Sequence, residues 1–195
     1  SSISSAFKAP NVDDFSKIFE KRGDLTIPNS NLKPETSING ELGSNYMNRY
    51  FDIDLSFFYT QVVDLMRKLP TNIDGVSTVD LNGDNVNLVS VQNKGVANVY
   101  GGFIALRLKL SNTLNWHSTA TITKAHFKGE NEIVPHIPPF YGKSSFNYNL
   151  KRLKFSVFAR INGKKDWRDF NVLNDNPDEA VYGYGSPAWA TLNVS

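Results

Sequence analysis

The chain contains no cysteine among its 195 residues. This absence excludes disulfide frameworks, thiolate zinc sites and cysteine nucleophiles. No run of 18 apolar residues exists either, so the sequence predicts no membrane-spanning helix and no membrane insertion. The first ten residues, SSISSAFKAP, lack the basic start and the apolar stretch of a signal peptide, so no secretory leader is expected.

An excess of charge of one sign is also missing. The chain carries 21 Lys and Arg against 19 Asp and Glu, a net charge of +2, and its basic residues are scattered. Proteins that bind nucleic acid concentrate basic residues on one surface. The sequence therefore predicts no nucleic-acid partner.

Signatures of catalysis and of cofactor binding are absent as well. No HExxH, GxSxG, GxGxxG or GxxxxGK pattern occurs, and the three histidines, His117, His126 and His136, lack neighbouring carboxylate clusters. We expect no metal site, no cofactor and no enzymatic activity. Asp166 and Asp169 leave hydrolysis of a glycosidic bond as an alternative, because two carboxyl groups in a groove can perform it.

Alternation of apolar and polar residues dominates the chain after Pro70. Residues 101–110, GGFIALRLKL, place leucines on one face and Arg107 and Lys109 on the other. Strands are also expected at residues 86–91, 118–123, 153–161, 166–173 and 188–194, with a hairpin turn at Asn162-Gly163. About seven or eight short strands indicate an antiparallel sandwich or barrel. We predict a mainly β fold, a jelly-roll-like antiparallel β-sandwich.

The first 70 residues show the helical patterns. Asn11 is placed to cap a helix with Val12, Phe15, Ile18 and Phe19 on one face, and Gly23 is placed to end it. Apolar residues three and four apart predict a second helix from about Leu55 to Leu69. We predict two parts, residues 1–70 as an arm with one or two short helices for docking or oligomerisation, and residues 71–195 as the binding sandwich.

Aromatic residues make up 12% of the chain, and several fall at predicted strand ends or loops beside polar residues. Sugars stack on aromatic rings and bond to planar polar side chains, and loops at the rim of a rigid sandwich collect such groups. The candidate ligand-binding residues are Trp116, His117, Tyr141, Trp167, Arg168, Asp169, Tyr182 and Tyr184. The alternative for Trp167 is a place in the core.

Four segments in this part of the chain carry a resemblance: GGFIALRLKLSNT, VPHIPPFYG, LKFSVFARINGKKDWRDFNVL and GYGSPAWATLNVS. In rhythm and order they resemble the head domains of receptor-binding and baseplate proteins of bacteriophage tails, over about residues 74–195. The resemblance implies a homotrimer in the virion that attaches to a host cell-surface saccharide and to other virion proteins.

Three classes of function follow from these observations. The first is a non-enzymatic virion adhesin or baseplate component. The second is a jelly-roll capsid or other structural virion protein, for which the polar N-terminal arm is the cue. The third is a monomeric carbohydrate-binding module of an extracellular or cell-surface protein.

Overall fold

The computed structural model describes residues 1–129, 134, 137–138, 140–170 and 185–195. Most of them lie in β-strands, so the mainly β, antiparallel prediction is confirmed. The chain forms two compact units. One consists of residues 1–4, 39–60 and 98–195, and the other of residues 5–38 and 61–97. The predicted division at Pro70 stays a prediction.

The larger sheet has eight strands. Its order is β1-β4-β5-β9-β10-β11-β12-β13, so neighbours in the sheet follow one another almost as they do in the sequence. A jelly roll instead interleaves strands through Greek-key connections. The predicted jelly-roll sandwich is therefore replaced by an up-and-down arrangement. The strands are β1 (Ser2–Lys8), β4 (Glu35–Met47), β5 (Phe51–Val63), β9 (Val96–Lys109), β10 (Leu114–Phe127), β11 (Tyr141–Leu150), β12 (Leu153–Asn162) and β13 (Trp189–Val194).

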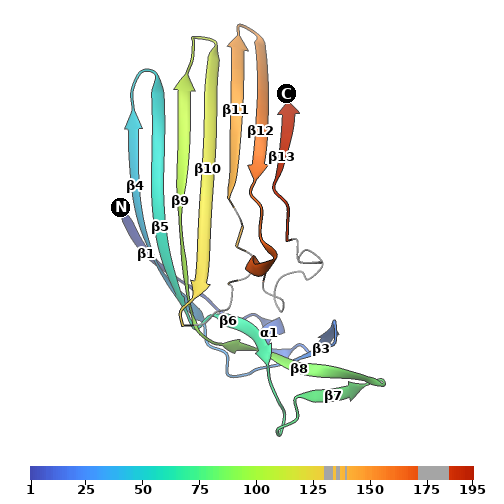
Figure 1. Ribbon diagram of the computed structural model, residues 1–195. Helices are drawn as coiled ribbons and strands as arrows, with labels where there is room; N and C mark the ends of the chain where they lie inside the picture. Colours follow the sequence, from blue (N-terminus) through green and yellow to red (C-terminus); the bar gives the residue numbers. More distant parts are fainter. Residues whose placement is uncertain (130–133, 135–136, 139, 171–184) are drawn as a thin grey trace. The chain divides into compact units, whose positions relative to one another are not determined.

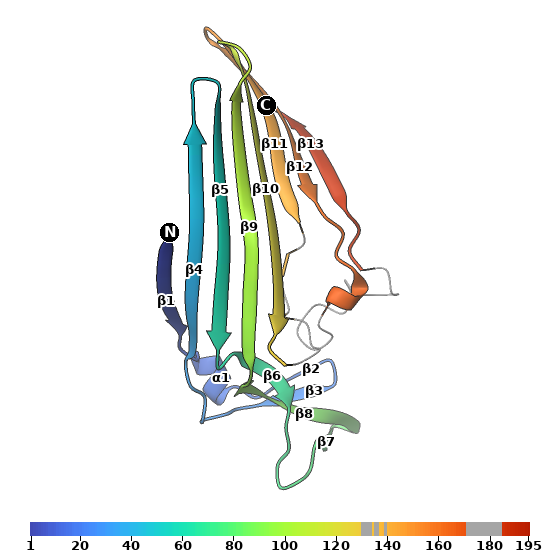
Figure 2. The same cartoon turned by 60° about the vertical axis from the view of Figure 1, so that its left-hand side comes forward.

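Short and long connections leave opposite ends of this sheet. The β4–β5, β9–β10 and β11–β12 turns are short, and Figures 1 and 2 show all three at the same end. Asn48 closes the first of them, because its side-chain oxygen accepts hydrogen bonds from the backbone N–H groups of Tyr50 and Phe51. The connections β5–β9, β10–β11 and β12–β13 are long and join strands at their other ends.

The smaller sheet has five strands in the order β2-β3-β8-β6, with β7 paired to β8. Strands β3 and β8 are parallel, whereas the other printed pairs of this sheet are antiparallel. Val86, Leu88 and Val89 of β8 are buried and form its core. The strands are β2 (Phe19–Lys21), β3 (Asp24–Ile27), β6 (Met66–Pro70), β7 (Thr78–Leu81) and β8 (Asp84–Asn93).

The first predicted helix exists but is short. Helix α1 (Val12–Ser16) begins at Asn11, whose side chain accepts from the backbone of Asp14, while Asp14 accepts from the backbone of Asn11. This reciprocal capping box is the reason the helix starts there. Gly23 does not end the helix; it occupies the left-handed region, at φ 80°, in the turn between β2 and β3.

The second predicted helix, Leu55 to Leu69, is wrong. These residues form most of β5 and β6. Both faces of β5 carry large apolar side chains, with Leu55 and Phe57 on one face and Phe58 on the other. Rings on both faces of a strand produce apolar spacings of three and four, which imitate a helix.

The expected returning strand at residues 166–173 is also not formed in its described part. Residues Trp167–Asp169 make a single 3-10 turn, η1, which Asp166 caps by accepting from the backbone N–H of Arg168. Strand β12 pairs with β13 instead, from Val157↔Val194 to Asn162↔Trp189.

No helix among the described residues has the length and apolarity needed to cross a membrane.

Candidate functional site

The two faces of the eight-stranded sheet differ in chemistry. Cross-strand register places Trp116, Phe146, Val157 and Val194 in one row. The next residues on the same face, two positions along each strand, are also mostly apolar. This apolar face includes Ile53, Leu55, Phe57, Ile104, Leu106, Leu108, Leu114, Ala120, Ile122, Tyr148, Leu153, Phe155, Ala159, Ile161, Ala190 and Leu192.

Many side chains of the apolar face are exposed. Leu192 is 74% exposed, Val194 63% and Leu42 63%. A water-soluble monomer rarely leaves apolar residues exposed over such a continuous area. The apolar face is therefore stable only in contact with an apolar environment.

The opposite face of the sheet is polar, and its side chains bond to one another across strands. Ser56 donates to Glu41 at 2.6 Å, and Thr60 donates to Asn39 at 2.7 Å. Ser156 likewise donates to Asn147 at 2.9 Å. These pairs join neighbouring strands at three places across the sheet, which gives the polar face an ordered network.

A charged cluster lies on the polar face near the short turns. Nη1 of Arg107 is 2.6 Å from Oδ2 of Asp52 and 2.9 Å from Oδ2 of Asp54. Asn45 donates to the other oxygen of each carboxylate, at 2.8 and 2.6 Å. The cation and the amide hold together two carboxylates that would otherwise repel each other. We call these four residues the arginine cluster.

Polar residues end the apolar face on the side of the long connections. Tyr59 donates to Oδ1 of Asn98 at 2.9 Å, and the Asn98 amide lies 3.3 Å from Nε2 of His126. The ring of Tyr100 meets the His126 ring edge-on, with 5.8 Å between centroids. We call these four residues the boundary cluster. At the other end, Trp116 stacks on Phe146 and donates to Ser144 at 2.7 Å.

An outer-membrane β-barrel is built of strands that are apolar on the outer face and polar on the inner face. Aromatic residues lie at both borders of its apolar band. Short turns at one end and long connections at the other belong to the same class. The pattern of this open sheet is therefore that of a segment of the wall of a transmembrane β-barrel.

The comparisons with known proteins agree with this class. The family model described as "TonB dependent receptor-like, beta-barrel" matches residues 1–195. The chain belongs to this family. No curated protein sequence matches it.

Solved structures of low sequence identity share the fold. The siderophore receptor PirA from Acinetobacter baumannii has a TM-score of 0.71 at 22% identity, with 98% of this chain and 31% of that chain covered. A mutant of the ferric enterobactin receptor PfeA from Pseudomonas aeruginosa has a TM-score of 0.71 at 19% identity, with 98% of this chain and 29% of that chain covered. The copper transporter OprC has a TM-score of 0.70 at 14% identity, with 98% of this chain and 28% of that chain covered. This chain thus spans less than a third of the length of each.

These findings correct the functional predictions. The resemblance to phage tail proteins is wrong, and so are the virion adhesin, the capsid protein and the carbohydrate-binding module. The predicted virion or cell-surface location, the saccharide and virion-protein partners, the homotrimer and the lack of membrane insertion are overturned by the same family match. The error has a physical cause: a barrel crosses a membrane with strands of about ten alternating residues, which a search for 18 apolar residues does not detect.

The predicted ligand-binding residues that the structure describes lie on different faces and elements. Trp116 lies on the apolar face, whereas His117 and Tyr141 lie on the polar face. Trp167, Arg168 and Asp169 form η1. Tyr182 and Tyr184 lie outside the described residues. A ligand-binding role for any of them stays a prediction.

Two observations bear on metal binding within the described part of the chain. No group of three or more His, Asp or Glu side chains there could hold a metal ion. The buried Nε2 of His117 has no hydrogen-bond partner among the described residues. A single imidazole nitrogen is not a metal site.

Sequence reasoning missed the arginine cluster. Residues 52–55 read Asp-Ile-Asp-Leu, so two carboxylates alternate with two apolar residues. This alternation is the signal of a strand. The helical interpretation of residues 55–69 obscured it.

Proposed function

We propose that this chain forms part of the wall of an outer-membrane receptor that imports a metal chelate with energy delivered through TonB. The observation that carries the proposal is the division of the eight-stranded sheet into an apolar and a polar face. The apolar face would contact lipid, and the polar face would line the interior of the barrel. The family match over residues 1–195 supports the same assignment.

The orientation follows from the lengths of the connections. Outer-membrane barrels have short turns on the periplasmic side and long loops on the external side. The turns after β4, β9 and β11 would then face the periplasm. The connections after β5, β10 and β12 would face the medium, where they would meet the ligand first.

The class of ligand is proposed from the proteins that share the fold. Of the three structures above, one is named as a siderophore receptor, one as a ferric enterobactin receptor and one as a copper transporter. We infer that the ligand is a small metal complex, with a ferric siderophore as the first to test. Import of such a complex breaks no covalent bond, so we expect no enzymatic activity.

Fractionation and uptake measurements test the proposal in the organism that makes the protein. The natural full-length protein should sediment with the outer membrane and resist extraction by high salt. Deleting its gene should reduce growth under iron limitation and uptake of a radioactive ferric siderophore, and the intact gene should restore both. Recovery of the protein in a soluble fraction would overturn the proposal. Unchanged uptake of every siderophore and of copper would overturn the ligand class.

A further inference from the structure

A polar pocket lies within the smaller unit. Its volume is about 510 Å³, which suits a small organic molecule rather than a single ion. All of its lining residues belong to residues 5–38 and 61–97, every one of which the structure describes. Amides and hydroxyls dominate the lining, contributed by Asn29, Asn31, Thr71, Ser90, Gln92 and Asn93. We call this space the amide pocket.

Two residues of opposite charge, Lys33 and Asp64, complete the lining of the amide pocket. Both side chains are exposed. Neither residue forms an ion pair, with the other or with any residue that the structure describes. The pocket therefore offers a ligand one cation and one anion at separate positions.

The side chain of Asn93 holds the backbones of both charged residues. Its oxygen accepts from the backbone N–H of Lys33 at 2.7 Å, and its nitrogen donates to the carbonyl oxygens of Lys33 and Asp64, both at 2.8 Å. Asp64 has a φ of 57°, which few residues other than glycine adopt, so this bond supports an unusual backbone. One amide thus fixes the two backbone positions from which the opposite charges project, and such preorganisation favours binding.

Neighbouring amides of the pocket are also held in place. Asn29 donates to the carbonyl oxygen of Val91 at 2.9 Å, and Gln92 donates to the hydroxyl oxygen of Ser90 at 3.1 Å. The side-chain oxygen of Gln92 accepts no hydrogen bond from the residues that the structure describes. It remains an acceptor for an N–H group of a ligand.

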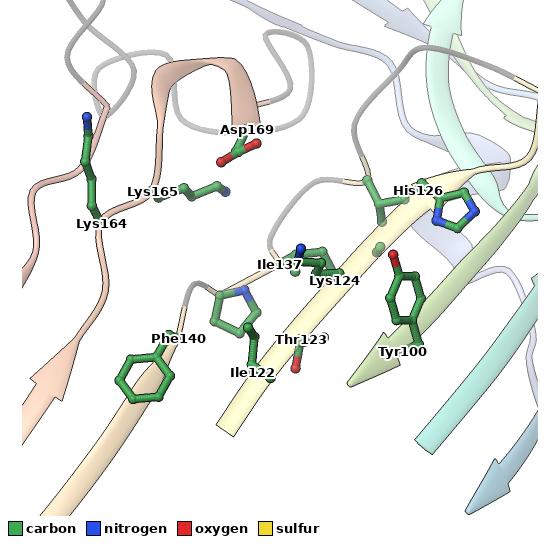
Figure 3. A pocket seen from close by; sticks show the side chains of 13 residues that line it. Tyr100, Ile122, Thr123, Lys124, His126, Ile137, Phe140, Lys164, Lys165 and Asp169 are labelled. Atoms are coloured by element: carbon green, nitrogen blue, oxygen red, sulfur yellow. The ribbon is translucent and has the colours of Figure 1, made fainter. Parts of the chain in front are cut away.

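Aromatic rings are absent from the residues that line the amide pocket. A pocket of about 430 Å³ in the larger unit differs in this respect, because Tyr100, His126 and Phe140 are among its lining residues, as Figure 3 shows. An aromatic ligand such as a catechol gains from stacking on rings. The amide pocket offers charges and hydrogen bonds instead, which favour a ligand group that is charged and not aromatic.

From these observations we infer that the amide pocket binds a zwitterionic group, an ammonium and a carboxylate close together, on the periphery of the imported metal chelate. Lys33 contacts the carboxylate of this group and Asp64 contacts its ammonium, both through charge-assisted hydrogen bonds. A ligand with a single charge would leave the opposite residue uncompensated. The inference rests on the proposed function, because it takes a metal chelate as the ligand and the connection after β5 as exposed to the medium.

Binding of a matched series of ferric chelates tests the inference. Ferrioxamine B carries one ammonium, its N-acetyl derivative no charge, its N-succinyl derivative one carboxylate, and its γ-glutamyl derivative both an ammonium and a carboxylate. Quenching of tryptophan fluorescence measures their affinities for the natural full-length protein in detergent. The glutamyl derivative should bind about tenfold more tightly than any other, since each of the others lacks at least one charge-assisted hydrogen bond. L-Glutamine, which has the same two charges without the chelate, should not displace it at equal concentration.

Two single substitutions should each remove one part of this selectivity. Lys33→Gln should weaken binding of the succinyl and glutamyl derivatives about tenfold and should not weaken binding of ferrioxamine B. Asp64→Asn should weaken binding of ferrioxamine B and the glutamyl derivative by a similar factor and should not weaken binding of the succinyl derivative. Asparagine tolerates the left-handed backbone at position 64, so the second substitution preserves the turn.

Matched controls come from the same unit. Lys21 and Asp74 are exposed and lie outside the amide pocket, and Asp74 shares a positive φ, of 49°, with Asp64. Lys21→Gln and Asp74→Asn should therefore bind all four chelates like the unchanged protein. Equal losses in the control and the test variants would overturn the inference. Equal affinity for the four chelates, binding of none of them, or displacement by L-glutamine would overturn it too.

The location and transport of the protein distinguish this failure from failure of the proposed function. If the protein lies in the outer membrane and its gene supports uptake of another ferric siderophore, only the zwitterion site is refuted. Absence of the unchanged protein from the outer membrane would refute the proposed function.

Discussion

Tyr59 of β5 donates its phenolic hydrogen to the side-chain oxygen of Asn98 on β9 across a distance of 2.9 Å. Asn98 is only 7% exposed, so this bond satisfies a buried amide oxygen. It lies where the apolar face gives way to polar residues. The bond thus fixes two neighbouring strands at the proposed border of the membrane.

Removal of this hydroxyl tests its structural value. Tyr59→Phe should lower the free energy of unfolding by about 1 kcal/mol, because the largely buried side-chain oxygen of Asn98 loses one hydrogen bond. Unfolding in urea, followed by loss of the folded band in a gel, measures the change in the natural full-length protein. Tyr46→Phe is the control, since Tyr46 is 60% exposed and its hydroxyl makes no hydrogen bond recorded among the described residues. Equal effects of the two changes would contradict the role of the Tyr59 bond.

Adjacent residues of β5 test the assignment of the two faces. Leu55→Lys places a charge on the apolar face and should destabilise the barrel by about 2–4 kcal/mol, the cost of a cation near the middle of the bilayer. Ser56→Lys places the same charge on the polar face, where Glu41 is within reach of position 56. This second variant should fold nearly as well as the unchanged protein. The measurement is the yield of folded protein when each variant is refolded into lipid vesicles. Equal yields for the two variants would mean that the faces are wrongly assigned.

The arginine cluster predicts a pattern of loss and rescue. Arg107→Ala should lower the free energy of unfolding only slightly, since exposed ion pairs contribute little individually, but two carboxylates are left side by side. Asp52→Asn in the same chain should restore much of the loss by removing the repulsion. Arg107→Lys should retain most of the stability, because a single nitrogen makes both contacts in the structure.

Salt provides an independent check on the same cluster. Because the cluster is partly exposed, 1 M salt should reduce the difference between Arg107→Ala and the unchanged protein. The measurement is urea unfolding at low and high salt. A difference that is independent of salt and is not rescued by Asp52→Asn would show that the arginine acts through packing.

Gly101 of β9 predicts a steric effect on the polar face. A Cβ atom there would collide with the carbonyl oxygen of Ile122 and would lie 2.7 Å from the ring of Phe58. Gly101→Ala should therefore destabilise the barrel by about 1–3 kcal/mol, the usual cost of overpacking. Gly40→Ala is the matched control in β4, because nothing lies within 4 Å of its added carbon. Similar unfolding midpoints for both variants would contradict the close packing of Phe58 on Gly101.

Several elements of the fold were predictable because their signals are local. The alternation in residues 101–110 and 153–161 identified β9 and β12, and Asn11 identified the start of α1. The Asn82-Gly83 turn between β7 and β8 has positive φ at both residues, as expected for these residue types. Prediction failed at β5, where Phe58 packs on a glycine about 40 positions further along the chain. No local pattern announces such a contact.

The sequence by itself determined that this protein is built of antiparallel strands with one apolar and one polar face, because side chains alternate along any strand. Only the tertiary structure decided what those faces are for. Eight strands side by side join the separate apolar rows into one continuous exposed surface, which water disfavours and lipid accommodates. The same pairing brings Arg107 to Asp52 and Asp54, and Tyr59 to Asn98, over separations of 39 to 55 residues in the chain. Those contacts depend on strand order and register, which local patterning leaves open.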